Sequence, residues 1–235
     1  MKTLSGRRYK AVLLFLAFLL VGAGGVFCDD YSWDGEADTD WSNAVNWYND
    51  TTTTNDDGYP AGVGDTATFG DYTVTLTNIP AGTMDAVTIN TSGTITLGAD
   101  LNTTAMTLSA GTLNDGGNTI TAVGAVDLSG GTFTSTGTFT LSGGAAQTVA
   151  GNITFNNLSI SKSGGSASFS GNLTTSTDLT TASAAYDISF TGGTNSFTAA
   201  APPVAFNNTG TLTLGNGGDD FTFDGGLTAT APGTL

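Results

Sequence analysis

Residues 107–144 decide the fold, and they read TLSAGTLNDGGNTITAVGAVDLSGGTFTSTGTFTLSGG. Leu-Ser-Ala-Gly-Thr-Leu at 108–113 returns as Leu-Ser-Gly-Gly-Thr-Phe at 128–133, twenty residues later. Thr-Ile-Thr at 119–121 returns as Thr-Phe-Thr at 138–140, nineteen residues later. A repeat of about twenty residues is too short to bury its own apolar face, so it becomes stable only when neighbouring copies stack. The stretch therefore predicts a solenoid of stacked turns.

Outside this stretch, apolar and hydroxyl residues alternate in the same way. Tyr72, Val74 and Leu76 are separated by threonines, and the alternation returns around Val87 and Ile95. Period-two alternation is typical of half-buried strands, and glycine clusters between the runs supply the positive-φ corners of a solenoid. We therefore predict an all-β protein, a parallel β-helix (β-solenoid). An antiparallel β-sandwich array is the alternative, because it would share much of this alternation.

A longer echo lies further along the chain. Residues 153–157, ITFNN, resemble residues 204–208, VAFNN, fifty-one residues later. We interpret this echo as a superrepeat of two to three turns. The sequence stops at Leu235, inside the second copy and without an aromatic or charged closing segment. Because free solenoid ends need capping, we expect residues 71–235 to be solenoid repeats truncated at the C-terminus, with the remainder of a longer chain as their neighbour.

Residues 1–28 have the pattern of a secretory signal peptide. A basic start, MKTLSGRRYK, is followed by an apolar segment from Ala11, and Val26 and Cys28 are small enough to precede a cleavage site. The strongest apolar part, residues 11–23, is shorter than the ~20 residues that span a bilayer. We expect cleavage before Asp29, no membrane insertion afterwards, and a secreted or cell-surface location.

The charge distribution argues against two classes of partner, nucleic acids and anionic membranes. Four of the five basic residues lie in the first ten positions, so removal of the signal leaves Lys162 against all twenty acidic side chains, a formal charge of −19. Such an acidic surface repels phosphate backbones and anionic lipids. We expect no nucleic acid partner and no attachment to anionic membranes.

Residues 29–70 differ in composition from the rest and form a separate aromatic, acidic segment. This segment holds every tryptophan of the chain: Trp33, Trp41 and Trp47. Terminal turns of solenoids are capped, and each large aromatic side chain buries 150–250 Å², so we predict an aromatic N-terminal cap. The alternative is that the three tryptophans contact a glycan by stacking on its sugar rings, in a binding module centred on residues 31–59.

The same segment contains a second candidate site, a run of alternating acidic residues. Its members are Asp34, Glu36, Asp38 and Asp40. Calcium binds 6–8 oxygen atoms, and an EF-hand loop has glycine at position 6 and glutamate at position 12. Counted from Asp34, these positions hold Thr39 and Val45, so the pattern fails at both. The run is thus not an EF-hand loop. A calcium-dependent adhesion module at these four residues is kept as an alternative, and we otherwise expect no cofactor.

Catalytic chemistry has few candidates. The chain has no histidine, which excludes imidazole bases, Ser-His-Asp triads and His-bound metals. Carboxylate pairs are what glycosidases use, and the candidates are Asp219, Asp220 and Asp224, or the Asp56-Asp57 pair. Aspartate is also common in turns, and we predict that the protein is not an enzyme; a carbohydrate-active β-helix enzyme is the second alternative.

The pattern W-D-G…W…NW…P-x-x-x-G-D-x-A-x-F at 33–69 resembles the N-terminal region of large secreted bacterial β-solenoid proteins. AQTVAGNITFNNLSI at 146–160 and YDISFTGGTNSFTA at 186–199 resemble the β-strand repeats of autotransporter-type and haemagglutinin-like surface proteins. The resemblance covers most of residues 31–235 and implies a right-handed parallel β-helix. It also implies a structural or adhesin-like extracellular rod, with surface glycans or other cell-surface proteins as its partners.

Overall fold

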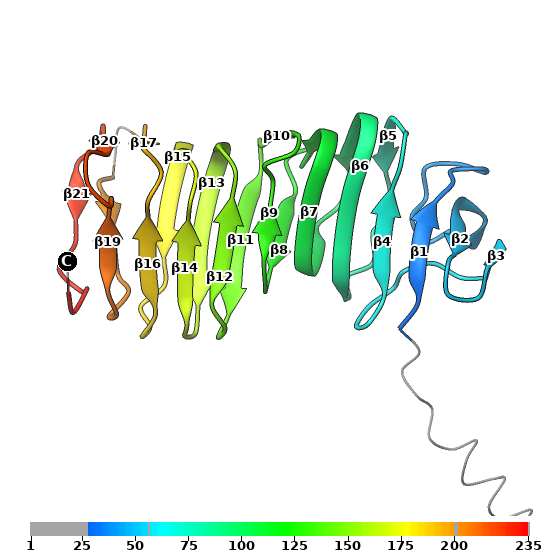
Figure 1. The fold of residues 1–235 in the computed structure, drawn as a ribbon, viewed down its shortest axis with the longest axis horizontal. Helices are drawn as coiled ribbons and strands as arrows, with labels where there is room; N and C mark the ends of the chain where they lie inside the picture. Colours follow the sequence, from blue (N-terminus) through cyan, green and yellow to red (C-terminus); the bar gives the residue numbers. More distant parts are fainter. Residues whose placement is uncertain (1–27, 56, 200–201, 235) are drawn as a thin grey trace, which may run out of the picture.

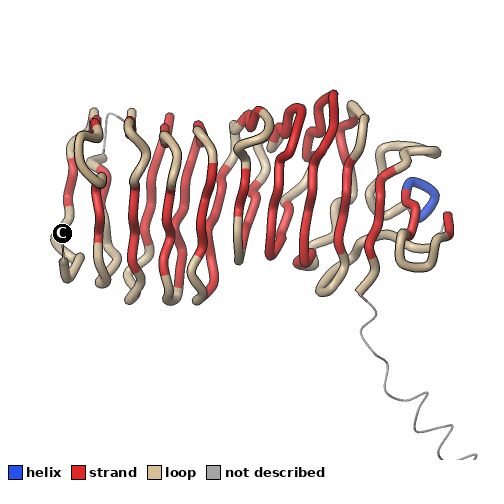
Figure 2. Tube along the Cα trace, in the orientation of Figure 1, coloured by secondary structure: helices blue, strands red, loops and turns tan. Residues whose placement is uncertain are grey.

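The computed structural model describes residues 28–55, 57–199 and 202–234. The predicted signal peptide, except for Cys28, lies outside these residues. The described chain is an elongated stack of strands joined by short loops, with about eight turns (Figures 1 and 2). None of its helices has the length and apolar character needed to cross a membrane.

Strands that end at a corner of the solenoid are short, whereas strands that continue around a corner are long. In chain order they are β1 (Asp30–Trp33), β2 (Trp47–Asn49), β3 (Thr54–Asn55), β4 (Thr66–Phe69), β5 (Val74–Leu76), β6 (Thr83–Leu97), β7 (Leu101–Asn114), β8 (Thr119–Ala122), β9 (Val126–Asp127), β10 (Thr132–Thr134), β11 (Thr138–Gly143), β12 (Gln147–Ala150), β13 (Ile153–Lys162), β14 (Ser166–Phe169), β15 (Leu173–Thr181), β16 (Asp187–Phe190), β17 (Thr194–Phe197), β18 (Val204–Ala205), β19 (Leu212–Leu214), β20 (Asp220–Phe223) and β21 (Leu227–Thr228). A single 3-10 turn, Ala44–Asn46, precedes β2 among the described residues.

Each turn of the stack passes through three rows of parallel strands, which we call faces A, B and C. Face A contains β1, β4, the middle parts of β6 and β7, β9, β12, β14, β16 and β19. Face B contains β5, the last parts of β6 and β7, β10, the first parts of β13 and β15, β17 and β20. Face C contains the first parts of β6 and β7, β8, β11, the last parts of β13 and β15, β18 and β21. This parallel pairing confirms the β-solenoid and excludes the antiparallel sandwich array.

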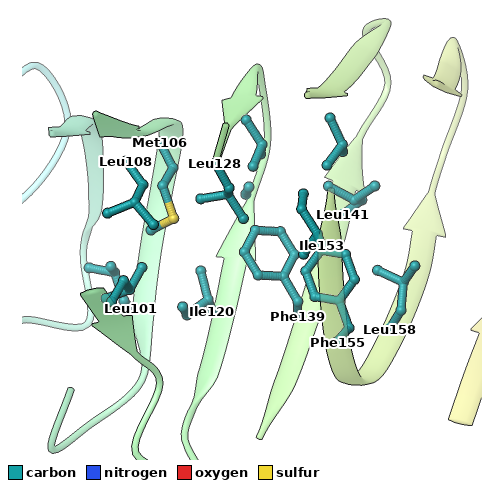
Figure 3. Packing of buried hydrophobic residues seen from close by; sticks show 14 of the residues in the cluster. Leu101, Met106, Leu108, Ile120, Leu128, Phe139, Leu141, Ile153, Phe155 and Leu158 are labelled. Carbon is teal, nitrogen blue, oxygen red and sulfur yellow. The ribbon is translucent and has the colours of Figure 1, made fainter. Parts of the chain in front are cut away.

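The alternation in the sequence places one apolar residue per strand at the same height in successive turns. On face C, Ile120, Phe139 and Leu158 are register partners, and all three are buried (Figure 3). On face A, one inward column continues through eight strands: Ala67, Val87, Met106, Val126, Val149, Phe169, Phe190 and Leu214. Burial of these columns, at about 25 cal/mol per Å² of apolar surface, is the main stabilisation of the stack.

Glycine is required at the corner that the opening stretch supplies. Gly111 has φ +75°, a conformation that L side chains rarely adopt, and a β-carbon there would collide with the carbonyl oxygen of Thr91 in the preceding turn. Thr91 is itself buried, and its hydroxyl donates to the carbonyl of Tyr72, one turn further back. Close stacking of successive corners therefore leaves no space for a side chain at this position.

The structure confirms the twenty-residue repeat and corrects the superrepeat. Register partners on face A are nineteen residues apart at Val87 and Met106 and twenty-four apart at Phe190 and Leu214. The two copies of the longer echo lie on different faces, since residues 153–155 pair on face B and residues 204–205 on face C. An offset of fifty-one residues is therefore two turns and part of a third, and the echo does not mark a larger structural unit.

The first segment of the chain builds directly onto the first turn. β1 pairs in parallel with β4 and antiparallel with β2, and β2 pairs antiparallel with β3. These are the antiparallel pairings among the described strands, and Figure 1 places them at one end of the stack, with β19 to β21 at the other.

Candidate functional site

The three tryptophans of the N-terminal segment form one aromatic cluster with Phe69 of β4. The ring centroids of Trp33 and Trp47 are 5.0 Å apart, as are those of Trp41 and Trp47. Phe69 lies 5.8, 5.4 and 5.5 Å from the rings of Trp33, Trp41 and Trp47. The cluster thus joins residues 33–47 to the first strand of the solenoid proper.

The rings in this cluster are inaccessible to a ligand. The exposed fractions of Trp33, Trp41 and Trp47 are 3%, 0% and 0%. The indole N–H of Trp41 donates to the carbonyl of Pro60 at 2.8 Å, and that of Trp47 donates to the carbonyl of Trp41 at 2.7 Å. A sugar-stacking surface needs an exposed ring face, and none of the three tryptophans has one in this conformation.

Two of the four acidic candidates for calcium are occupied by hydrogen bonds within their own loop. The Asp38 carboxylate accepts from the Asp40 backbone N–H at 2.9 Å and the Asn46 amide at 2.7 Å, and these bonds lower its pKa. The Asp40 carboxylate accepts from the Ser42 hydroxyl at 2.7 Å and from the Asn78 amide at 2.8 Å, which likewise lower its pKa. These carboxylates therefore stabilise the loop and link it to the chain at Asn78.

The other two acidic candidates differ in exposure. Asp34 is half-buried next to Trp33, and Glu36 is exposed. Across the described residues, no three His, Cys, Asp or Glu side chains converge in a group that could hold a metal ion. The structure thus places Asp34, Glu36, Asp38 and Asp40 in one loop without gathering their carboxylates around a common point.

The carboxylates considered for sugar cleavage lie around β20. Asp219 accepts a hydrogen bond from the backbone N–H of Asn216 within a turn. Asp220 begins β20 and Asp224 follows its last residue, and both side chains are exposed. Four residue-to-residue steps along the strand place their Cα atoms about 13 Å apart, whereas glycosidase carboxyl groups lie roughly 5–9.5 Å apart. Asp220 is thus the first residue of the strand and Asp224 the first residue of the turn that follows it.

The structure shows a buried polar network that the sequence did not indicate. Lys162, at the end of β13, has an exposed fraction of 2%. Its ammonium group donates to the side-chain oxygen of Gln147 at 2.6 Å, to the carbonyl of Ala145 at 2.8 Å and to that of Ser142 at 3.4 Å. Desolvation by burial lowers the pKa of Lys162. Three acceptors match the three donors of an ammonium group, so the side chain has a structural role at this corner.

Gln147 extends this network into the preceding turn. Its amide nitrogen donates to the carbonyls of Ala122 and Gly124, both at 2.9 Å. Further along the stack, the hydroxyl of Tyr186 donates to the carbonyls of Ile160 and Ala182 at 2.9 and 3.0 Å. Side chains pointing inward thus satisfy backbone carbonyls at the corner between faces C and A.

A second buried polar group, Asp115, lies at the corner after β7. Its carboxylate accepts from the backbone N–H groups of Thr136 at 2.9 Å, Gly137 at 3.1 Å and Gly117 at 3.0 Å. Burial alone would raise the pKa of Asp115, but the hydrogen bonds from Thr136 and Gly117 outweigh it and lower the pKa. The aspartate therefore holds the corner of the next turn, and the adjacent Gly116-Gly117 pair is the signal that marks it in the sequence.

A scan against family models finds no match for this chain, and searches of curated proteins and of solved structures also find none. The class of protein is therefore defined by its own architecture, a β-solenoid of parallel stacked strands whose interior contains hydrophobic columns and a few hydrogen-bonded polar side chains.

Proposed function

We propose that the protein is an extracellular structural or adhesin-like rod of a bacterial cell surface. The observation that carries the proposal is the nineteen-stranded sheet, a continuous stack in which every strand except β2 and β3 pairs in parallel with a strand of a neighbouring turn. In such a stack each turn contacts only its neighbours, so length is gained by adding turns and stability is spread along the axis. A rod built in this way can hold its far end away from the surface to which its base is attached, as a stalk or an adhesin must do.

The interior of the stack supports this proposal. The described core consists of hydrophobic columns, with aromatic pairs between neighbouring turns such as Phe169 with Phe190 and Phe197 with Phe223. Their ring centroids are 4.9 and 4.8 Å apart. Contacts of this kind between turns resist separation along the axis, as a load-carrying rod requires.

In this proposal the aromatic, acidic segment of residues 29–70 supplies the N-terminal cap. The support is the packing of Trp33, Trp41 and Trp47 on Phe69, together with the antiparallel addition of β2 and β3 to the edge of β1. An uncovered edge strand is a template for unwanted pairing with other chains. At the N-terminal end of the stack the edge of β1 is covered by the two very short antiparallel strands β2 and β3.

Export is the step that distinguishes this proposal from an intracellular scaffold. The test is to express the full chain in a bacterial host, separate cytoplasm from exported material, and determine the N-terminal residue of the product. The proposal expects an exported protein that begins at Asp29. A chain retained in the cytoplasm with residues 1–28 intact would contradict it. A variant with Leu13→Arg and Leu16→Arg, which interrupts the apolar segment, is the matched control and should remain inside the cell.

A further inference from the structure

Seven threonines and one asparagine form a two-column grid on the outside of face B. The grid spans four successive turns: the segment 73–75, the last parts of β6 and β7, and β10. Its members are Thr73, Thr75, Thr94, Thr96, Thr112, Asn114, Thr132 and Thr134. The residues between the two columns, Val74, Ile95, Leu113 and Phe133, point inward as register partners. Because side chains alternate across a strand, both columns face outward.

The register of the strands keeps the grid aligned. Thr75 pairs with Thr96, and Asn114 pairs with Thr96 on one side and Thr134 on the other. Thr112 pairs with Thr94 and Thr132 in the second column. Neighbouring strands are about 4.8 Å apart, and alternate residues along a strand are about 6.6 Å apart. The polar side-chain groups, seven hydroxyls and the amide of Asn114, therefore repeat in two directions with fixed spacings.

Most of these hydroxyl groups are available to an outside partner. In the part of the chain that the structure describes, the hydroxyls of Thr75, Thr96, Thr112 and Thr132 form no hydrogen bond to other residues. None of the eight positions carries a charge or an aromatic ring. Threonine is stiff about χ1, so little side-chain entropy is lost when such an array meets a rigid partner.

A partner for this surface must be neutral, must form hydrogen bonds and must itself repeat in two dimensions. We propose that face B binds ice through this threonine grid. Oxygen atoms on the prism faces of hexagonal ice form a rectangular lattice of similar dimensions, and the threonine methyl groups can lie between rows of ordered water while the hydroxyls join them. A crystalline polysaccharide is the competing repeating partner, but proteins that bind such surfaces use exposed aromatic rings, and this face has none.

The other faces explain the choice of face B. On face A the threonines at 68, 88 and 107 form one column, and the neighbouring column holds Ala86 and Ala105. On face C threonine pairs occur in two turns, β8 and β11, and the pattern then changes to Asn157 with Ser159 and to Asp178 with Thr180. Face B thus has the longest uncharged two-column array in the described residues.

The test measures thermal hysteresis (the gap between melting and freezing temperature) and partition of the purified protein into slowly growing ice. The variant Thr94→Tyr/Thr112→Tyr places two bulky rings in the centre of the grid. The matched control, Thr88→Tyr/Thr107→Tyr, alters register partners on the same two strands, β6 and β7, but on face A. The proposal expects hysteresis and enrichment in ice for the wild type and for the control. The face B variant should lose both, while its thermal unfolding temperature stays that of the wild type.

Three outcomes would overturn the proposal. The first is a wild type that shows no hysteresis and is excluded from ice. The second is equal loss in the face A and face B variants, which would separate ice binding from the grid. The third is retention of the wild type on microcrystalline cellulose or chitin without enrichment in ice, which would assign the face to a polysaccharide. This proposal goes beyond the rod function, and the purified protein gives its answer whether or not the chain is exported.

Discussion

The side-chain nitrogen of Lys162 lies 2.6 Å from the side-chain oxygen of Gln147, in the interior of the stack and without a carboxylate among its hydrogen-bond acceptors. The two residues belong to successive turns, and Gln147 in turn holds two carbonyls of the turn before it. One buried pair therefore connects the corners of three turns.

This relationship predicts that the two side chains stabilise the protein as a unit. Lys162→Met keeps the volume but leaves the Gln147 oxygen and the Ala145 carbonyl without their donor, and we expect a loss of about 2–4 kcal/mol in the free energy of unfolding. In a double-mutant cycle with Gln147→Leu, measured by urea unfolding, the coupling energy should be about 1–3 kcal/mol. Additive single effects would show that the pair does not act as a unit.

Asp115 predicts a pH dependence of stability with a defined sign. Its pKa is lowered in the folded state, so its stabilisation is complete above the pKa of an unfolded aspartate, about 3.9, and is lost as the pH falls through the lower folded value. Asp115→Asn should cost about 2 kcal/mol at pH 7, and the difference from wild type should shrink in acid. The measurement is urea unfolding of both proteins between pH 7 and pH 2. A pH-independent difference would contradict the assignment.

The aromatic cluster predicts that the N-terminal segment is an integral part of the folded unit. Trp47 is fully buried against Trp33, Trp41 and Phe69, and Trp47→Ala should reduce the free energy of unfolding by about 3–5 kcal/mol. Val63, which is 76% exposed, provides the control, because Val63→Ala removes no buried contact. If both variants unfold at the wild-type urea concentration, the segment does not stabilise the first turn.

The corner at Gly111 predicts a position-specific effect of a single methyl group. Gly111→Ala must place a side chain at φ +75° against the Thr91 carbonyl, and we expect destabilisation of at least about 2 kcal/mol. Gly62 has open space around the position of a β-carbon, so Gly62→Ala should be neutral or slightly stabilising. Thermal unfolding of the two variants checks the contrast, and equal melting temperatures would argue against close stacking of the corners.

The stack itself was predictable from the sequence because its cause is local and repeated. An inward Ile120, Phe139 or Leu158 recurs at the same height in each turn, and the period of about twenty residues is the length of chain that one turn consumes. The fifty-one-residue echo was wrongly interpreted as a superrepeat because the same local packing requirement recurs in every turn. Every strand-and-corner unit solves the same packing problem, so residues 153–157 and 204–208 look alike although they lie on different faces.

The candidate sites were less predictable, since burial depends on what packs against a residue. Residues 29–70 contain three tryptophans, but their presence alone does not distinguish an exposed sugar-stacking surface from a buried aromatic cluster. The burial of the rings and their packing on Phe69 show that they face inward. Likewise, the sequence shows Lys162 only as the one basic residue after the signal segment, and its burial becomes clear only from the acceptors that surround it, Gln147, Ala145 and Ser142.

Successive turns lie in parallel register about twenty residues apart, and cysteine cross-linking tests this register most directly. Thr121 and Thr140 face outward as register partners on β8 and β11, at a Cα separation within the 4.4–6.8 Å range of disulfides. Thr121→Cys/Thr140→Cys, in a Cys28→Ser background, should form an intramolecular disulfide on mild oxidation. Thr121→Cys/Ser142→Cys, displaced by two residues along β11 to about 8 Å, should remain reduced. A disulfide in the displaced pair, or none in the register pair, would contradict the stacked architecture.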